Sequence, residues 1–263
     1  MKIAVVGYGK MGHMVEKILQ TRGHTCVCTV DLFAGDATCV TSDHVAMADA
    51  VRRSGAEGVI EFSHPASAVQ NIRALLPLRR PLVVGTTGWL DKLGEIRELV
   101  DLNKTSLLYA SNFSVGVNLF YRMVSAAAAM MAGFDDAYDA AVFEAHHNQK
   151  ADSPSGTGID IARRVMENFP RKTALVTDAF TRKPEPHELH LASLRVGAVP
   201  GTHSVVFDSA ADSIQLTHTA RTREGFAAGA VRALEWLAAP DASGKSRTGV
   251  FTMDDVFDSL LGG

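Results

Sequence analysis

Residues 2–31 read KIAVVGYGKMGHMVEKILQTRGHTCVCTVD, and this stretch decides the fold. It predicts a strand at Lys2–Val6, followed by a glycine turn at Gly7–Gly12. A helix with apolar residues at helical spacing follows at Lys10–Thr21, and a second strand at Thr25–Val30. The second strand ends at an acid, Asp31. A strand, a G-x-G-x-x-G turn, a helix, a strand and an acid in this order predict a dinucleotide-binding unit.

Each part of this stretch has an expected contact with the cofactor. The residues of the turn expected to bind the cofactor are Gly7, Tyr8, Gly9, Lys10, Met11 and Gly12. Glycine permits a tight turn and a close approach of the pyrophosphate to the N–H groups at the start of the helix. Asp31 stands where a carboxylate accepts hydrogen bonds from the ribose hydroxyls. The alternative is a purely structural glycine turn.

Strands and helices continue to alternate after a stretch at 32–56 that shows no clear element. We expect strands and helices at Gly58–Phe62, Ala66–Leu76, Pro81–Val84, Asp91–Leu102 and Ser106–Ala110. This alternation predicts an α/β fold with a Rossmann-type, doubly wound parallel sheet. Ligands bind at the carboxyl ends of such strands. The loops expected to contact the nicotinamide half of the cofactor are therefore Gly85, Thr86 and Thr87, and Ala110, Ser111, Asn112 and Phe113.

The pattern changes after a long helix at 115–132. Strand-like runs at 137–145, 190–196, 203–209 and 213–220 lie too close together for a helix between each pair. They predict a second, α+β domain with a mixed or antiparallel sheet. We expect a dinucleotide-binding domain at 1–113, completed by two helices within 223–263, and a second domain at 114–222.

The segment EAHHNQKADSPSGTG at 144–158 carries the most specific chemistry. His146 and His147 precede Lys150, and Ser155, Gly156 and Thr157 open a helix whose N–H groups can bind an anion. A lysine, a histidine and a helix N-terminus thus converge on a negative charge, while the other histidine can move a proton.

Other interpretations of this segment are weaker. Either histidine alone is more often structural. A zinc site is disfavoured because adjacent histidines on extended backbone point to opposite sides, and because we find no cysteine or acidic partner at ligand spacing. We therefore expect no metal. The phosphate loop GxxxxGK[ST] is absent from the sequence, which disfavours a nucleoside-triphosphate hydrolase.

The segment resembles the signature E-x-H-H-x-x-K-x-D-x-P-S-G-T of the 4-hydroxy-tetrahydrodipicolinate reductase (dihydrodipicolinate reductase) family of lysine and diaminopimelate synthesis. Every fixed position of that signature is present between Glu144 and Thr157. The resemblance extends along the chain through GTTG at 85–88, SNFSVGVN at 111–118, VPGTHSVVFDS at 199–209 and LTHTARTREGFAAGAVRALEWL at 216–237.

This resemblance implies the reduction of a cyclic dicarboxylate with NADH or NADPH, and a homotetramer built by the second domain. It maps the proton donor to His146 and a proton-transfer and substrate-binding role to Lys150. It maps carboxylate binding to His147, Gly156 and Thr157, beside Ser155. Two departures bear on cofactor choice. The glycine turn is short and carries Lys10, and Leu32 and Phe33, which are not basic, follow Asp31. We expect NADH to be preferred, because Asp31 repels a 2′-phosphate.

Composition limits the remaining alternatives. Net charge is −3 and aromatic residues make up 7%, so a dedicated nucleic-acid binder is not expected. The longest apolar stretch, at 124–134, is shorter than the roughly 20 residues that span a bilayer. Three cysteines without a CxxC pair suggest reduced thiols and a cytoplasmic protein. Two rival functions remain: a dehydrogenase of another small imino or keto acid, and a catalytically silent NAD-responsive binding protein.

Overall fold

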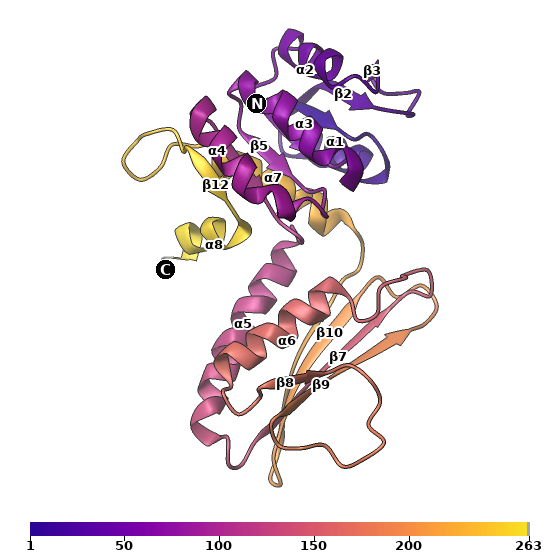
Figure 1. Ribbon diagram of the computed structural model, residues 1–263, viewed down its shortest axis with the longest axis vertical. Coiled ribbons are helices and arrows are strands. Elements are labelled where there is room, and N and C mark those ends of the chain that lie inside the picture. Colours follow the sequence, from indigo (N-terminus) through magenta and orange to yellow (C-terminus); the bar gives the residue numbers. More distant parts are fainter. Residues whose placement is uncertain (262–263) are drawn as a thin grey trace. The chain divides into compact units, whose positions relative to one another are not determined.

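The computed structural model describes residues 1–261, whose elements fall into two compact units (Figure 1). The first unit contains residues 1–115 and the chain from Glu224 onward, and the second contains residues 116–223. The chain therefore leaves the first unit once and returns to it. Each unit has its own sheet and its own buried core.

A seven-stranded sheet, in which all neighbouring strands are parallel, forms the centre of the first unit. Its strands, in their order across the sheet, are β12 (Gly249–Phe251), β6 (Ser106–Tyr109), β5 (Leu82–Val84), β4 (Gly58–Glu61), β1 (Lys2–Val6), β2 (Thr25–Asp31) and β3 (Cys39–Val40). From β3 to β6 this is the doubly wound order 3-2-1-4-5-6. The predicted Rossmann-type fold is confirmed.

Helices cover both faces of this sheet. They are α1 (Lys10–Thr21), α2 (His44–Arg53), α3 (Pro65–Leu75), α4 (Leu93–Asn103), α7 (Glu224–Ala238) and α8 (Met253–Leu261), with single 3-10 turns at Leu76–Leu78 and Leu90–Lys92. Alternate residues of β1 face opposite sides. Ile3 and Val5 share a core with α1, α7 and α8, whereas Ala4 and Val6 share one with α2, α3 and α4.

Three elements of the first unit, two short strands and a helix, were not predicted from the sequence. Residues 32–56 contain β3 and α2, and the start of α2 is fixed by Asp43, whose carboxylate accepts hydrogen bonds from the N–H groups of Val45 (2.8 Å) and Ala46 (3.4 Å). The three-residue strand β12 pairs with β6 and extends the sheet. Both strands are too short to show a pattern.

The second unit contains a five-stranded mixed sheet. Its order is β11 (Ser213–Thr219), β10 (Thr202–Asp208), β7 (Asp139–His146), β9 (Glu188–Arg195) and β8 (Ala174–Val176). β10 is antiparallel to both of its neighbours, and β9 is parallel to both of its own. A mixed sheet was predicted and is confirmed, although β8 was not expected.

Two helices, α5 (Val115–Met131) and α6 (Gly156–Asn168), share one core with this sheet, to which Val124, Val165 and Phe207 contribute fully buried side chains. With the 3-10 turn Ala132–Phe134, α5 is the one helix among the described residues that is long and apolar enough to cross a membrane. Length and composition alone meet that test. In this fold the buried side of α5 contacts the sheet and α6.

Candidate active site

The glycine turn between β1 and α1 contains glycines of two kinds. Gly7 has a φ of +88°, and a Cβ there would lie 2.1 Å from the carbonyl oxygen of Phe62. A Cβ on Gly12 would lie 2.3 Å from the carbonyl oxygen of Gly7. The packing of the turn therefore requires both. A Cβ on Gly9, the N-cap of α1, would meet nothing within 4 Å, which leaves space at the helix N-terminus where phosphates bind.

The other residues of the turn point in different directions. The hydroxyl of Tyr8 donates to Glu16 and its ring stacks on His13, with 4.0 Å between ring centroids. Lys10 is exposed as the first residue of α1, and Met11 packs against the core shared with that helix. The Tyr8 side chain is therefore engaged within the protein, whereas the Lys10 ammonium remains accessible.

Asp31 is held rigidly at the end of β2. Its carboxylate accepts hydrogen bonds from the backbone N–H groups of Tyr8 (2.6 Å), Phe33 (2.8 Å) and Ala34 (3.0 Å). Partial burial opposes ionisation, but the hydrogen bonds from Phe33, Ala34 and Tyr8 outweigh it and lower the pKa of Asp31. The group is thus an ionised acceptor at a fixed position.

A cavity of about 660 Å³ opens beside Gly9 and Asp31. Its far wall includes residues that were not predicted from the sequence, among them His44, Met47, Ser63, His64 and Asn71. The sequence could have identified two of them from their position after a strand. Ser63 and His64 follow β4, at the same carboxyl edge of the sheet as the loops after β5 and β6.

A buried polar network supports this wall. Glu61, fully buried at the end of β4, accepts hydrogen bonds from the N–H (3.2 Å) and hydroxyl of Ser63 and from Asn71 Nδ2 (3.2 Å). Asn71 Oδ1 in turn lies 2.9 Å from His44 Nδ1. Burial raises the pKa of Glu61 above its ordinary value despite these hydrogen bonds. The network connects β4, α2 and α3.

The two predicted nicotinamide loops follow β5 and β6. Thr86 is buried and its hydroxyl accepts a hydrogen bond from the N–H of Ser63 (2.8 Å), whereas Thr87 is exposed. Gly85 lies against Phe62, because a Cβ there would be 2.0 Å from that ring. In the second loop Ala110 is half-buried, Ser111 is exposed and Asn112 is buried. The side chain of Phe113 belongs to the core, so this residue can reach a cofactor only through its backbone.

In the second unit, a buried carboxylate connects three strands and a helix. Glu144 on β7 is fully buried and accepts hydrogen bonds from the N–H (2.9 Å) and hydroxyl of Ser155 and from Arg195 Nη2 (3.0 Å). Burial opposes its ionisation, but hydrogen bonds from His203, Ser155 and Arg195 outweigh burial and place the pKa of Glu144 far below its ordinary range. The carboxylate is ionised at neutral pH.

His146 is the last residue of β7, and only 7% of its surface is exposed. Its Nδ1 lies 3.4 Å from Glu144 Oε2, and its ring meets that of His203 edge to face at 5.0 Å between centroids. Burial lowers the pKa of His146 to about 4; Glu144 opposes this shift, while the charges of His203, Lys150 and Arg195 add to it. The imidazole of the free protein is therefore neutral at pH 7.

The remaining predicted substrate residues lie on the turn after β7 and at the start of α6. Lys150 Nζ lies 2.8 Å from Asp152 Oδ1, and the Lys150 N–H donates to the carbonyl oxygen of His147 (3.1 Å). Ser155 is the N-cap of α6, and its hydroxyl accepts from the N–H of Gly158 (3.0 Å). Gly156 and Thr157 form the first turn of that helix.

Glu144, Arg195 and His203, which lie around His146, were not predicted as site residues. Ligand atoms of Glu144, His146 and His203 lie within 4.8 Å of one another. The prediction of no zinc relied on there being no acidic partner near the histidines. That premise was wrong, because Glu144 lies on the same strand face two residues before His146. The absence of a metal stays a prediction. It is favoured by the guanidinium of Arg195, a fixed cation already bound to the same carboxylate.

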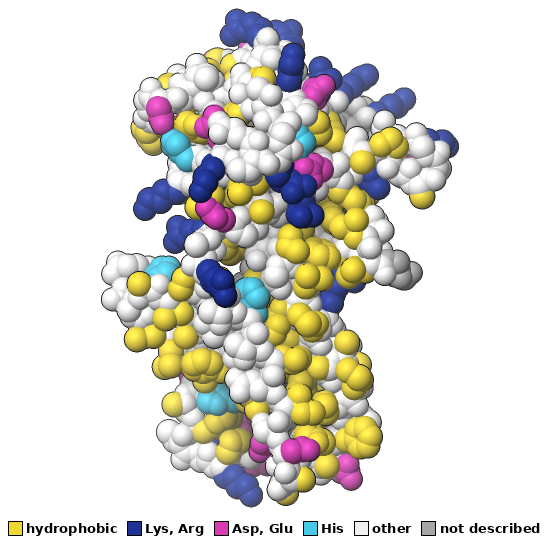
Figure 2. All heavy atoms as spheres, turned by 180° about the vertical axis from the view of Figure 1, so that it is seen from behind, with side chains coloured by type: hydrophobic (Ala, Val, Ile, Leu, Met, Phe, Trp, Pro, Cys, Tyr) yellow, Lys and Arg dark blue, Asp and Glu magenta, His cyan; other side chains and the backbone are white. Residues whose placement is uncertain are grey.

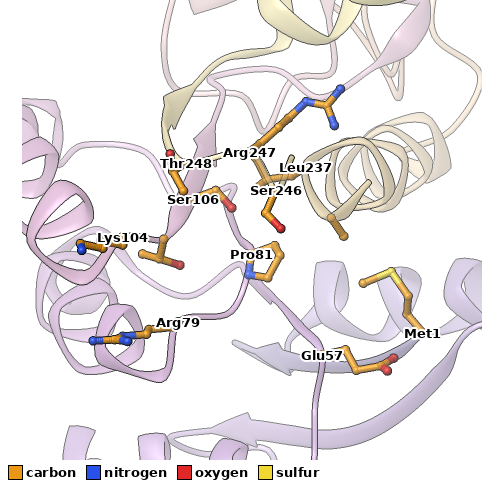
Figure 3. Close-up of a pocket in the computed structure, with 12 residues that line it drawn as sticks. Met1, Glu57, Arg79, Pro81, Lys104, Ser106, Leu237, Ser246, Arg247 and Thr248 are labelled. Atoms are coloured by element: carbon orange, nitrogen blue, oxygen red, sulfur yellow. The ribbon is translucent and has the colours of Figure 1, made fainter. Parts of the chain in front are cut away.

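A second cavity of the first unit, of about 480 Å³, lies at the amino ends of the strands (Figure 3). Arg79 and Lys104 line it, but Figure 3 shows their cationic ends directed away from its centre. Arg247 donates to the carbonyl oxygens of Trp236 (2.8 Å) and Pro240 (3.0 Å). The positive charges of this cavity therefore do not converge on a ligand.

Comparison with known proteins covers almost the entire chain. The family models for the N-terminus and the C-terminus of dihydrodipicolinate reductase match residues 1–113 and 116–257. Two curated 4-hydroxy-tetrahydrodipicolinate reductases are similar, one from Christiangramia forsetii (38% identical, 99% of both chains) and one from Archaeoglobus fulgidus (34% identical, 98% of this chain and all of the relative).

A solved structure shares the fold. It is a dipicolinate-bound dihydrodipicolinate reductase from Paenisporosarcina sp. TG-14, with a TM-score of 0.74 and 20% identity over 96% of this chain and 97% of that one. The fold, the two family models and the full-length relatives agree. The chain belongs to the dihydrodipicolinate reductase family, the NAD(P)H-dependent oxidoreductases with 4-hydroxy-tetrahydrodipicolinate reductase activity in lysine biosynthesis.

Proposed function

We propose that the two units divide the work of this reductase. The dinucleotide-binding domain is assigned to 1–113 completed by 223–263, and the substrate-binding and oligomerisation domain to 114–222. The cavity beside Gly9 and Asp31 supports the first assignment, and the cluster around His146 supports the second. The cofactor supplies a hydride to a ring carbon of the substrate, and the residues of this chain bind the two molecules and provide a proton.

For the cofactor, we infer that NADH is preferred over NADPH. Three backbone N–H groups fix the Asp31 carboxylate, so it cannot turn away from a 2′-phosphate. The residues that follow it, Leu32 and Phe33, are 47% and 84% exposed and carry no charge to offset that repulsion. Lys10 is the accessible cation of the glycine turn and the one residue of that turn that can bind a 2′-phosphate.

For the substrate, the proposed ligands of the two carboxylates are His147, Lys150, Ser155, Gly156 and Thr157. The start of α6 contributes a helix N-terminus, whose backbone N–H groups and dipole favour an anion. Lys150 contributes a cation that Asp152 now holds and that a dianion can recruit. A dicarboxylate bound here also compensates the positive charge around His146.

His146 is proposed as the proton donor. The reaction adds a hydride and a proton to the ring and releases water, so a group in the site must be protonated when the hydride arrives. In the free protein the pKa of His146 is about 4. Because a bound dianion favours the imidazolium, substrate binding would raise this pKa and charge the donor when it is needed.

The second unit is the proposed site of homotetramer assembly. Both α5 and α6 pack on one face of its sheet. The other face carries Phe143, paired across the strands with Ser204 and Ala192. Figure 2 shows hydrophobic side chains exposed on this unit, and Leu194 of β9, on the same face as Phe143, is 51% exposed. Light scattering should give a mass near four chains, whereas a fully active monomer would contradict the assignment.

The activity itself has a direct test. The upstream synthase, supplied with pyruvate and aspartate semialdehyde, generates the unstable substrate, and NADH absorbance then reports its reduction. Absorbance should fall with this mixture and stay constant when either the synthase or the semialdehyde is omitted. Equal oxidation without the synthase would favour a dehydrogenase of another small acid. We keep the prediction that the enzyme works in the cytoplasm.

A further inference from the structure

Glu144 has no role in the site described so far, although four elements converge on it. It is fully buried on β7 and pairs across the sheet with His203 on β10. Arg195 comes from β9, and Ser155 caps α6. A carboxylate placed at this junction fixes the relative positions of the strand that carries His146 and of the helix start that receives the substrate.

One oxygen of this carboxylate faces two imidazoles. Glu144 Oε2 lies 3.4 Å from His146 Nδ1 and 3.6 Å from His203 Nε2. A carboxylate oxygen only accepts hydrogen bonds, so whichever imidazole nitrogen binds it must carry a hydrogen. Of these two nitrogens, His146 Nδ1 is buried and forms no hydrogen bond with another described residue, whereas His203 Nε2 also lies 3.4 Å from Ser155 Oγ. Both nitrogens face the same carboxylate oxygen, and Glu144 Oε2 is the acceptor that His146 Nδ1 can reach.

The opposite nitrogen of His146 lies against Gly201. This glycine is buried at φ +151°, and a Cβ there would be 3.1 Å from His146 Nε2. With Nδ1 turned toward Glu144, Nε2 is the nitrogen that remains to exchange a proton. The absence of a side chain at Gly201 keeps that nitrogen from being covered.

We propose that Glu144 is a positioning residue that binds the Nδ1 edge of His146 and favours its charged form, and that His203 acts against it by competing for the same oxygen. This inference depends on the proposed role of His146 as proton donor. The charged groups that face His146 are Glu144 on its own strand, Arg195 on β9, His203 on β10 and Lys150 on the following turn. Glu144 is the one anion among them.

Opposite shifts of the pH profile distinguish this arrangement from a merely structural one. At saturating substrate, kcat falls as pH rises through the pKa of the proton donor. In Glu144→Gln the amide can still bind Ser155 but carries no charge, so the fall should move about one pH unit lower. In His203→Gln the imidazole that faces the same carboxylate oxygen is removed, so the fall should move to higher pH.

A matched control is available on β9. Glu188 forms an ion pair with Arg182 (2.9 Å) away from His146, and Glu188→Gln should leave the position of the fall unchanged. If Glu144→Gln and His203→Gln lower kcat at every pH without moving the fall, the proposal is overturned. If Glu144→Gln does not fold, His203→Gln decides alone, because an unmoved fall in that variant also overturns it.

His146→Gln separates the two levels of inference. If the fall with pH persists in that variant, His146 is not the donor and the proposed function of this residue fails. If the fall of kcat with pH disappears in His146→Gln but keeps its position in Glu144→Gln, then His146 is the donor and Glu144 does not position His146. Nitrogen NMR of the His146 ring in free Glu144→Gln gives a readout independent of activity. The share of the Nδ1–H tautomer should fall in that variant.

Discussion

The cavity beside Gly9 and Asp31 in the first unit and the cluster around His146 in the second differ in the groups that line them. Beside the cavity, backbone N–H groups, space at Gly9 and one carboxylate, Asp31, offer binding to a ligand. Around His146, two imidazoles, a guanidinium and a buried carboxylate share one small volume, and the pKa values of both His146 and Glu144 are lowered there. The first region thus offers space and backbone donors, whereas the second brings together groups that can gain or lose a proton.

The largest expected effect tests whether the second region performs the chemistry. His146→Gln should lower kcat by about 10²–10⁴-fold, because a positioned general acid is lost. KM should change much less, since the proposed carboxylate ligands remain. Steady-state kinetics with the coupled assay measures both. His190→Gln, on β9 beside Phe180, is the control and should keep its kcat. A parental kcat in His146→Gln would remove this residue from the mechanism.

A smaller effect is expected at Lys150, a proposed ligand of the substrate carboxylates. Lys150→Ala should lower kcat/KM by about 10–100-fold, the cost of losing a charge-assisted hydrogen bond. Inhibition by pyridine-2,6-dicarboxylate should weaken in parallel. Lys183→Ala removes an exposed lysine of the same unit and should change neither quantity. If the inhibitor binds Lys150→Ala as tightly as the parent, Lys150 does not hold a carboxylate.

In the first region, a single charge is expected to decide between cofactors. The ratio of kcat/KM for NADH to kcat/KM for NADPH should be about 10, because the Asp31 carboxylate and the 2′-phosphate of NADPH form one unscreened like-charge contact. A ratio below one would reject the role given to Asp31. A ratio near one that rises in Lys10→Ala would instead show that Lys10 offsets the repulsion. No such change is expected in Lys17→Ala, whose lysine pairs with Glu224 at 2.9 Å.

The smallest effect concerns stability. Because the pKa of His146 is about 4 in the folded protein against 6.5 ordinarily, the unfolded chain binds the extra proton first as pH falls. The contribution is fully present above pH 6.5 and is lost toward pH 4, by about 1 kcal/mol after solvent screening. Urea unfolding at several pH values should show a weaker dependence in His146→Gln across this window. Equal slopes would mean that the ring is not buried as described.

Prediction from the sequence succeeds where a feature is local. The glycine turn, the ends of β1 and β2 and the start of α6 all follow from residues that are neighbours in the chain. It fails for short elements such as β12, whose three residues show no periodicity and which exists because β6 offers an unpaired edge. The start of α2 is marked by Asp43, but no clear apolar pattern follows it.

The candidate site shows the same division. The segment 144–158 is recognisable as a unit because its residues are adjacent in the chain. His203 and Arg195 were not predicted, because they reach Glu144 through the pairing of strands that are far apart in the chain. Which strands pair with each other cannot be inferred from a single sequence. Ser63 was missed for a simpler reason: the rule about strand ends was applied to β5 and β6 but not to β4.

The return of the chain to the first unit has a consequence for synthesis. The residues of the second unit are inserted between β6 and α7, so Val231, Leu234 and Leu237 of α7 leave the ribosome more than a hundred residues after Ile3 and Leu108, with which they share a core. Until they arrive, the part of this sheet face that α1 does not cover stays open to water, which costs about 25 cal/mol for each Å² of exposed apolar surface. The inserted unit can fold first, while the unit whose strands are made first must wait for the last part of the chain.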